Sequence, residues 1–315
     1  MISTSMLDFV KEYLADRRNL GFALKSEGTQ LHSFALFADR VGHRGPVTID
    51  LAVRWASSPN PRGRRFPGRR IEVIRPFARY RASLDAASEV PSRFLLGPRR
   101  CRPLHHIYTD EQIVELLAEA GKVRPAGGLR PKTYTTLFGL LAATGLRISE
   151  ALRLARPDVD LTTGVLVIRA TKFRKTRLVP LHATAVAALR DYVLERDRLV
   201  PHATASTFFL AASGGSLHYS TVRTVFLHLR RALGWAELAP RPRIHDLRHA
   251  FACHRLRDWY AQDLDPAVGI ASLATYLGHA HVTDTYWYLT GSPDLLALAA
   301  ARFEKQFGGA TGDQS

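Results

Sequence analysis

The sequence predicts a mainly α-helical protein with two domains and one small β-hairpin. Apolar residues recur at helical spacing through most of the chain. A basic, Pro-rich segment at residues 91–104 has the character of an interdomain linker. Only residues 164–181 contain paired runs typical of strands. With 315 residues and 46% hydrophobic content, the chain is long enough to build a core in each domain.

The N-terminal domain is predicted over residues 1–90 as a set of short amphipathic helices. Ser5, Ser26 and Thr48 are the predicted N-caps of the first three, because their side-chain oxygens can accept the free N–H groups of a first turn. The predicted helices are at about 5–20, 26–41, 48–56 and 71–87.

The C-terminal domain is predicted over residues 105–307, followed by a flexible tail at 308–315. Thr109 and Gln112 form a capping box that opens a helix to about Ala120. Gly145 interrupts the next helix, and a new one begins at Leu146. The remaining predicted helices are at about 132–143, 182–199, 218–233, 245–257, 266–277 and 293–307.

Two extended runs in this domain predict the β-hairpin. Residues 164–169 are β-branched and apolar, and residues 177–181 form a second extended run after a basic turn. Lys172 lies near the predicted tip, with Arg174 and Lys175 close by.

The charge balance favours a polyanionic partner. Lys and Arg number 44 against 28 Asp and Glu, a formal net charge of +16. Such a surplus favours phosphate contacts, so nucleic acid is the leading class of partner. The alternative is a genome whose composition simply favours arginine, and charge indicates affinity rather than chemistry.

A basic loop separates the third and fourth predicted helices. Proline and glycine break the helical pattern over residues 59–70. We expect this loop to grip a nucleic-acid backbone, the alternative being a solvated linker. Its arginines are Arg62, Arg64, Arg65, Arg69 and Arg70.

Cysteine content and hydropathy exclude several classes. Cys101 and Cys253 stand in unrelated contexts, so neither a disulfide framework nor a Cys-rich zinc site is predicted. No run approaches the roughly 20 apolar residues that span a bilayer, and no leader is recognisable. A soluble, cytoplasmic protein without a membrane partner is predicted.

Two arginine motifs suggest phosphate chemistry. His245 and Arg248 are three residues apart, so they share one face of a helix and can reach one target. A guanidinium grips two phosphate oxygens, and an imidazole can pass a proton to an ester oxygen. Arg147 follows the glycine break at a helix start, where free N–H groups favour anions, and Glu150 can brace it.

Together with two later motifs, these residues resemble the tyrosine recombinase, or phage integrase, family. The order and spacing of all four motifs match, over roughly residues 105–307. The first hundred residues match only in helical character and resemble the module that closes a two-domain clamp around DNA. The matching motifs are Thr144–Glu150, Thr171-Lys172 with Arg177–Leu181, His245–His249, and Leu277-Gly278-His279 with Tyr288.

The resemblance implies a role for each residue. Arg147 and Arg248 would bind the non-bridging phosphate oxygens, and Tyr288 would attack to form a 3′-phosphotyrosine. Lys172 would protonate the departing 5′ oxygen as general acid. His245 and His279 would assist, Glu150 would support, and Arg174 and Lys175 would contact DNA. No metal and no cofactor would be required.

The resemblance also implies a function and partners. It predicts a site-specific recombinase, integrase- or transposase-like, that cleaves and rejoins double-stranded DNA of a mobile element. A homo-tetramer on two synapsed duplexes is expected, with or without other recombinases. The C-terminal helix would pack on a neighbouring subunit or on its own domain.

Several alternatives remain open. Tyr286 lies two residues before Tyr288 and is a second candidate nucleophile, while His249 and His281 add imidazoles nearby. His245 and His249, four residues apart, could instead bind zinc. A type IB topoisomerase and a catalytically silent DNA-binding regulator are the other functions.

Overall fold

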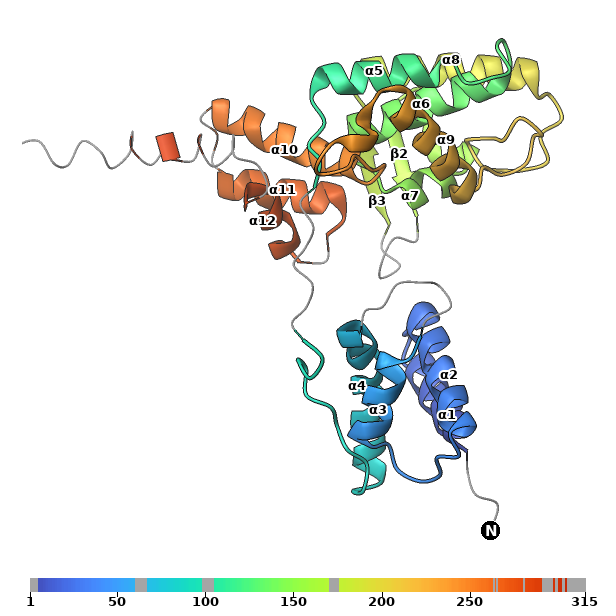
Figure 1. The fold of residues 1–315 in the computed structure, drawn as a ribbon. Coiled ribbons are helices and arrows are strands. Elements are labelled where there is room, and N and C mark those ends of the chain that lie inside the picture. Colours follow the sequence, from blue (N-terminus) through green and yellow to red (C-terminus); the bar gives the residue numbers. More distant parts are fainter. Residues whose placement is uncertain are drawn as a thin grey trace, which may run out of the picture. The chain divides into compact units, whose positions relative to one another are not determined.

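The chain forms two compact units, Met1–Arg102 and Pro103–Ser315, which are described separately (Figure 1). The computed structural model describes residues 5–59, 67–97, 105–169, 176–262, 264, 266–279, 281–290, 297, 300, 301 and 304, without the side chains of 266, 267 and 287–290. Among the described helices, none has the length and apolar character needed to cross a membrane.

The described part of the N-terminal unit is helical. Phe34, Trp55 and Phe77 lie at the centre of its core, and Phe34 packs edge-on against both other rings. Burial of a side chain of this size contributes roughly 1.5–3 kcal/mol. The helices are α1 (Met6–Asn19), α2 (Lys25–Arg40), α3 (Ile49–Ser57) and α4 (Pro67–Leu84).

Two of the three predicted N-caps are confirmed. Ser5 Oγ accepts the Asp8 N–H, and Thr48 Oγ1 accepts the Leu51 N–H, each at 3.2 Å. The cap predicted at Ser26 is wrong, because the chain turns through Leu24 in a left-handed conformation (φ 41°) and α2 begins before Ser26.

The fourth helix is displaced from its predicted bounds. It begins at Pro67 rather than Ile71, because the fixed φ of proline suits a first helical position. It ends at Leu84 rather than near residue 87.

The C-terminal unit packs helices around a small sheet. α6 lies at its centre, in contact with α5, α8 and α10, and Leu137, Phe138 and Leu141 bury its inner face. The predicted helix at 293–307 and the tail at 308–315 fall mostly outside the described residues and remain predictions. The helices are α5 (Asp110–Ala120), α6 (Leu129–Thr144), α7 (Ile148–Arg153), α8 (Ala183–Leu199), α9 (Tyr219–Ala232), α10 (Asp246–Ala261), α11 (Pro266–Leu277) and α12 (Thr283–Thr290).

The sheet contains the predicted hairpin. Its order is β1 (Val159–Asp160), β2 (Val165–Ile168), β3 (Arg177–Pro180), with antiparallel neighbours. Ile168 pairs with Arg177 at the end nearest the turn, so the hairpin is confirmed. The two-residue strand β1 was not predicted, because so short a segment carries no periodic signal. The turn itself, residues 170–175, lies outside the described residues.

The glycine break before Arg147 is confirmed. Gly145 has a φ of 61°, and a Cβ there would lie 2.5 Å from Cδ1 of Phe251. Only glycine combines this backbone conformation with so close an approach. The next helix begins at Ile148 rather than Leu146, because Arg147 is still extended and serves as its N-cap.

Candidate active site

Several segments of the C-terminal unit bring charged side chains together. Arg147 lies between α6 and α7, His245 and Arg248 lie at the start of α10, and His279 follows α11. Arg177 begins β3. α10 packs on α6, α11 and α12, and a cluster of apolar side chains shared by α10 and α11 supports this arrangement.

Glu150 holds Arg147 from one turn further along. Arg147 Nη1 donates to Glu150 Oε1 at 2.9 Å, and the Arg147 backbone N–H donates to Oε2 at 3.0 Å. Arg147 Nη2 also lies 3.5 Å from the carbonyl oxygen of Gly278. The Glu150 side chain is buried, whereas that of Arg147 is 27% exposed, so the guanidinium remains accessible to a ligand.

Arg248 is buried and connects two other segments of the site. Its Nη1 donates to the carbonyl of Gly145 and its Nη2 to the carbonyl of Leu277, both at 2.8 Å. These bonds join α10 to the loop before Arg147 and to the end of α11. Arg147 and Arg248 therefore contact adjacent carbonyls at the end of α11, those of Gly278 and Leu277, which brings the two arginines together.

His245 and His279 are both neutral at pH 7. Burial, reinforced by the positive charge of Arg248, lowers the pKa of His245 to about 4. Burial and the charges of Arg248 and Arg147 likewise lower the pKa of His279 to about 4. His279 Nδ1 is hydrogen-bonded to Oγ1 of the buried Thr285 at 2.7 Å, so α12 is tied to this imidazole.

No role was predicted for Arg177, yet this residue lies within the site. It donates to both Glu150 oxygens, Nη1 to Oε1 at 3.1 Å and Nη2 to Oε2 at 2.9 Å. Burial alone would raise the pKa of Glu150, but hydrogen bonds from Arg177 and Arg147 lower it to about 2. Two signals were available, the position of Arg177 at the start of the second extended run and its place in the matched motif Arg177–Leu181.

Comparisons with known proteins agree with this geometry. The sequence model of the phage integrase family matches residues 107–293, more than half of the chain. The chain belongs to the phage integrase family. The predicted family, mainly helical fold class and tyrosine-type site-specific recombinase activity are thereby confirmed.

Relatives in this family extend over nearly the whole chain. A Sinorhizobium fredii protein named as an integrase/recombinase, y4rB, is 40% identical over 306 residues, covering 95% of this chain and 96% of its own. The tyrosine recombinase XerD of Caulobacter vibrioides is 32% identical over 291 residues, 89% of each chain.

Solved structures show the same fold. The Tn1549 transposon integrase in complex with transposon right end DNA has a TM-score of 0.69 at 17% identity, covering 96% of this chain and 99% of that one. XerH bound to a palindromic difH substrate, a post-cleavage complex, has a TM-score of 0.64 at 19% identity, covering 94% and 84%.

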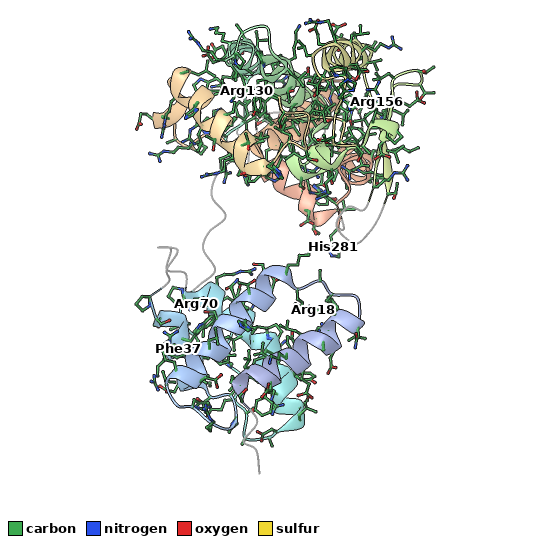
Figure 2. All side chains as sticks on the ribbon, turned by 90° about the vertical axis from the view of Figure 1, so that its right-hand side faces the viewer. Arg18, Phe37, Arg70, Arg130, Arg156 and His281 are labelled. Atoms are coloured by element: carbon green, nitrogen blue, oxygen red, sulfur yellow. The ribbon has the colours of Figure 1, made fainter. Side chains whose placement is uncertain are left out.

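Some residues that the family motifs select lie outside the described part of the structure. Lys172, Arg174 and Lys175 belong to residues 170–175 and remain predictions. Tyr288 lies in the last turn of α12, but its side chain is not described. Tyr286 on the same helix is exposed, as is His281 (Figure 2).

The N-terminal arginines differ in their surroundings. Arg70 (Figure 2) lies over the ring of Trp55 at 3.9 Å and donates to the carbonyls of Ala56 and Ser58. These contacts stabilise the end of α3. Arg69 is largely exposed beside two glutamates and stays a predicted DNA contact. Arg62, Arg64 and Arg65 lie outside the described residues.

A buried polar cluster next to His245 bears on the zinc alternative. Ligand atoms of His105, Asp246 and His249 lie within 4.8 Å of one another. However, Arg243 donates to both Asp246 oxygens and places Nη2 2.8 Å from His105 Nδ1. The rings of His105 and His249 are stacked at 3.6 Å, so their in-plane lone pairs do not converge on one ion.

The same cluster gives His245 its surroundings. The His249 ring stands edge-on to that of His245 at 4.9 Å. Burial and the neighbouring His105 lower the pKa of His249 to about 2, so this imidazole is neutral as well. The cluster therefore fits a positioning device for α10 better than a metal site.

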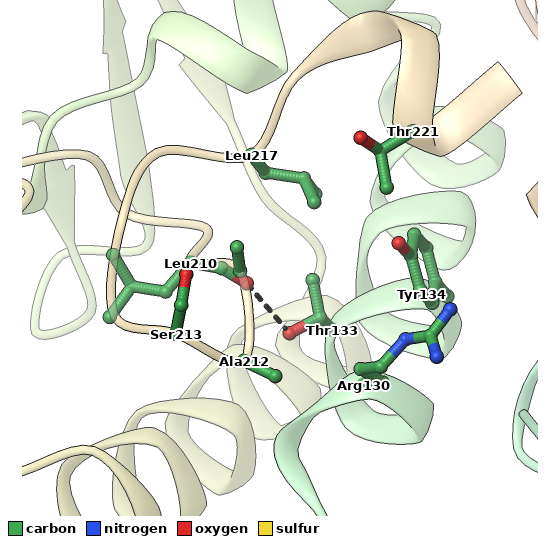
Figure 3. Close-up of a pocket in the computed structure, with 9 residues that line it drawn as sticks. Arg130, Thr133, Tyr134, Leu210, Ala212, Ser213, Leu217 and Thr221 are labelled. Atoms are coloured by element: carbon green, nitrogen blue, oxygen red, sulfur yellow. Dashed lines mark hydrogen bonds between the residues drawn. The ribbon is translucent and has the colours of Figure 1, made fainter. Parts of the chain in front are cut away.

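A separate cavity of 260 Å³ lies between the start of α6, residues 210–217 and α9 (Figure 3). Thr133 and Tyr134 line it, and Thr133 Oγ1 donates to the carbonyl of Leu210 at 3.2 Å. Among the described residues, Arg147, His245, Arg248 and His279 do not line it, so this cavity is separate from the site that they form.

Proposed function

We propose that the protein cleaves and rejoins double-stranded DNA through a 3′-phosphotyrosine on Tyr288. The observation that carries this proposal is the convergence of Arg147, Arg248, His245 and His279 from separate segments. Two guanidiniums and two imidazoles in one place suit a phosphate whose charge increases in the transition state.

The charges support binding of a phosphodiester. The guanidiniums of Arg147 and Arg177 share the Glu150 carboxylate, and that of Arg248 donates to two backbone carbonyls. Two guanidiniums share one carboxylate and Arg248 adds another positive charge, so the arginines leave a positive excess for an anion. Binding of the phosphate would in turn raise the imidazole pKa values, since a nearby negative charge favours the protonated form.

The reaction follows from these roles. The phenol oxygen of Tyr288 attacks phosphorus while its proton passes to a neutral imidazole of the site. The bond from phosphorus to the 5′ oxygen breaks, and Lys172 supplies a proton to that oxygen. The tyrosyl ester keeps the energy of the broken bond. A 5′ hydroxyl of a partner strand then attacks phosphorus and releases Tyr288, so rejoining needs no further energy source.

Helical periodicity supports Tyr288 over Tyr286. Position 288 follows position 285 by three residues, so both lie on the same face of α12. Thr285 on that face is bonded to His279. Position 286 lies on another face, and Tyr286 is 48% exposed.

The two units would have different roles, and several copies of the protein would act together. The N-terminal unit would form the core-binding domain at residues 1–90, joined by the 91–104 linker to the catalytic domain at 105–307. The active species would be a homo-tetramer on two synapsed duplexes, acting in integration or transposition. The λ integrase structure with a similar fold is a dimer bound to a core site.

The alternative functions receive less support. A type IB topoisomerase would not be expected to match the phage integrase family over residues 107–293. A silent DNA-binding regulator would be expected to lack catalytic residues, whereas Arg147, His245, Arg248, His279 and Tyr288 are all present.

The proposal is tested with a suicide duplex, nicked near the cleavage point and carrying the end sequence of the protein's own element. We expect a covalent protein–DNA adduct on a denaturing gel, formed without metal or nucleotide. If the wild-type protein binds this duplex but forms no adduct, the silent DNA-binding function is the better explanation.

Thr285→Val should slow adduct formation about tenfold. The change keeps the side-chain volume but removes the hydroxyl bonded to His279 Nδ1, a loss of about 1–1.5 kcal/mol. Single-turnover cleavage measures the effect. Thr283→Val, at an exposed position of the same helix, is the control. Equal rates for the two variants would contradict a role for the Thr285 hydroxyl.

A further inference from the structure

Arg177 occupies a central position among the residues of the candidate active site. Its Nε donates to the carbonyl of Tyr276 at 2.9 Å, while both terminal nitrogens donate to Glu150. The side chain is only 12% exposed, which places it behind Arg147 rather than at the surface of the site. One guanidinium thus joins β3, α7 and the end of α11.

The Glu150 carboxylate is shared between two arginines. Oε1 accepts from Arg147 Nη1 at 2.9 Å and from Arg177 Nη1 at 3.1 Å. Oε2 accepts from the Arg147 backbone and from Arg177 Nη2. Without Arg177, the full negative charge of Glu150 would act on Arg147 alone. Arg177 therefore leaves more of the positive charge of Arg147 for a phosphate.

The second function of Arg177 concerns the turn that carries His279. Gly278 has a φ of 68°, and a Cβ on it would lie 2.8 Å from Arg177 Nη1. The carbonyl of the same Gly278 faces Arg147 Nη2 at 3.5 Å. Arg177 thus packs against the backbone segment from Tyr276 to His279. The same segment contacts Arg147 through the Gly278 carbonyl.

We infer that Arg177 is a positioning residue for strand cleavage, which holds Arg147 through Glu150 and the His279 turn through the Tyr276 carbonyl. This inference rests on the proposed function. Arg177 also stands at the base of the hairpin whose turn contains Lys172, because it pairs with Ile168. It therefore connects the strands that flank the predicted general acid to the phosphate-binding arginine.

The test is Arg177→Lys, which keeps the positive charge but cannot donate to both Glu150 oxygens and to Tyr276 at once. We expect single-turnover adduct formation on the suicide duplex to fall about 10²-fold, the effect of a misplaced catalytic group. The Kd for the duplex should be unchanged. Arg156→Lys is the matched control, because Arg156 makes an equally bidentate but exposed pair with Asp197, at 2.7 Å twice (Figure 2).

A second substrate separates positioning from general destabilisation. A methyl group replaces one non-bridging oxygen of the scissile phosphate and removes its charge, so correct placement of Arg147 matters less. On this duplex, the ratio of the wild-type rate of adduct formation to the Arg177→Lys rate should be smaller than on the natural phosphate.

Three results would overturn the inference. Arg177→Lys could cleave as fast as Arg156→Lys. Its cleavage rate could fall by the same factor on both duplexes. Its loss of cleavage could also be matched by an equal loss of DNA affinity. Absence of an adduct with the wild-type protein is a different result, because it overturns the recombination chemistry itself and this role with it.

Discussion

Tyr288→Phe is expected to abolish covalent attachment to DNA, with a loss of at least about 10³-fold in adduct formation. Phenylalanine keeps the ring but lacks the oxygen that attacks phosphorus, so DNA binding and stability should change little. Adduct formation on the suicide duplex, measured on a denaturing gel beside a binding assay, separates the two effects.

Tyr286→Phe is the matched control for the nucleophile. It removes the same phenol from the same helix, two positions earlier, where the ring is exposed. This variant should form the adduct at the wild-type rate. If Tyr286→Phe loses the adduct and Tyr288→Phe keeps it, the nucleophile has been assigned to the wrong tyrosine.

Arg248→Lys is expected to reduce adduct formation by about 10²–10³-fold, as does loss of a donor to a transition-state oxygen. The buried guanidinium donates to the carbonyls of Gly145 and Leu277, and a single ammonium cannot replace both bonds and bind a phosphate. An orphaned buried carbonyl should also lower the free energy of unfolding by about 1–3 kcal/mol. Single-turnover cleavage and thermal unfolding measure the two losses.

The control for this prediction lies on the same helix. Arg255 is 54% exposed on α10, where it pairs with Asp258 at 3.9 Å and lies 5.7 Å from the centre of the Phe251 ring. Lysine can keep both weak contacts, so Arg255→Lys should change neither cleavage nor stability. Wild-type cleavage by Arg248→Lys would contradict a direct role for the Arg248 guanidinium in binding the phosphate.

Signals contained within a few neighbouring residues predicted much of the fold. The N-cap at Ser5 and the capping box at Thr109 form as expected, because their partners stand three residues away. The break at Gly145 and the hairpin were also predicted, from a glycine and from β-branched runs. The cap predicted at Ser26 was wrong, since the left-handed turn at Leu24 has no marker of its own in the sequence.

In the candidate site too, local features were predicted from the sequence and long-range contacts were not. Spacing placed His245 and Arg248 on one turn, and the family motifs selected Arg147, His279 and Tyr288. No partner could be predicted for Arg177, because its contact with Glu150 joins residues 27 positions apart on different elements. The stacking of His105 on His249 likewise depends on tertiary structure, because it joins the segment before α5 to α10.

The sequence by itself therefore determined the family, the order of the helices and the chemical type of each candidate catalytic group, because caps, periodicity and motif spacing are local properties. The tertiary structure decided which groups share a carboxylate and which are buried. Arg248 bonds to a carbonyl 103 positions away, and burial by surrounding elements makes His245 and His279 neutral. Such long-range contacts and desolvation arise only when distant segments pack, and no short stretch of sequence encodes them.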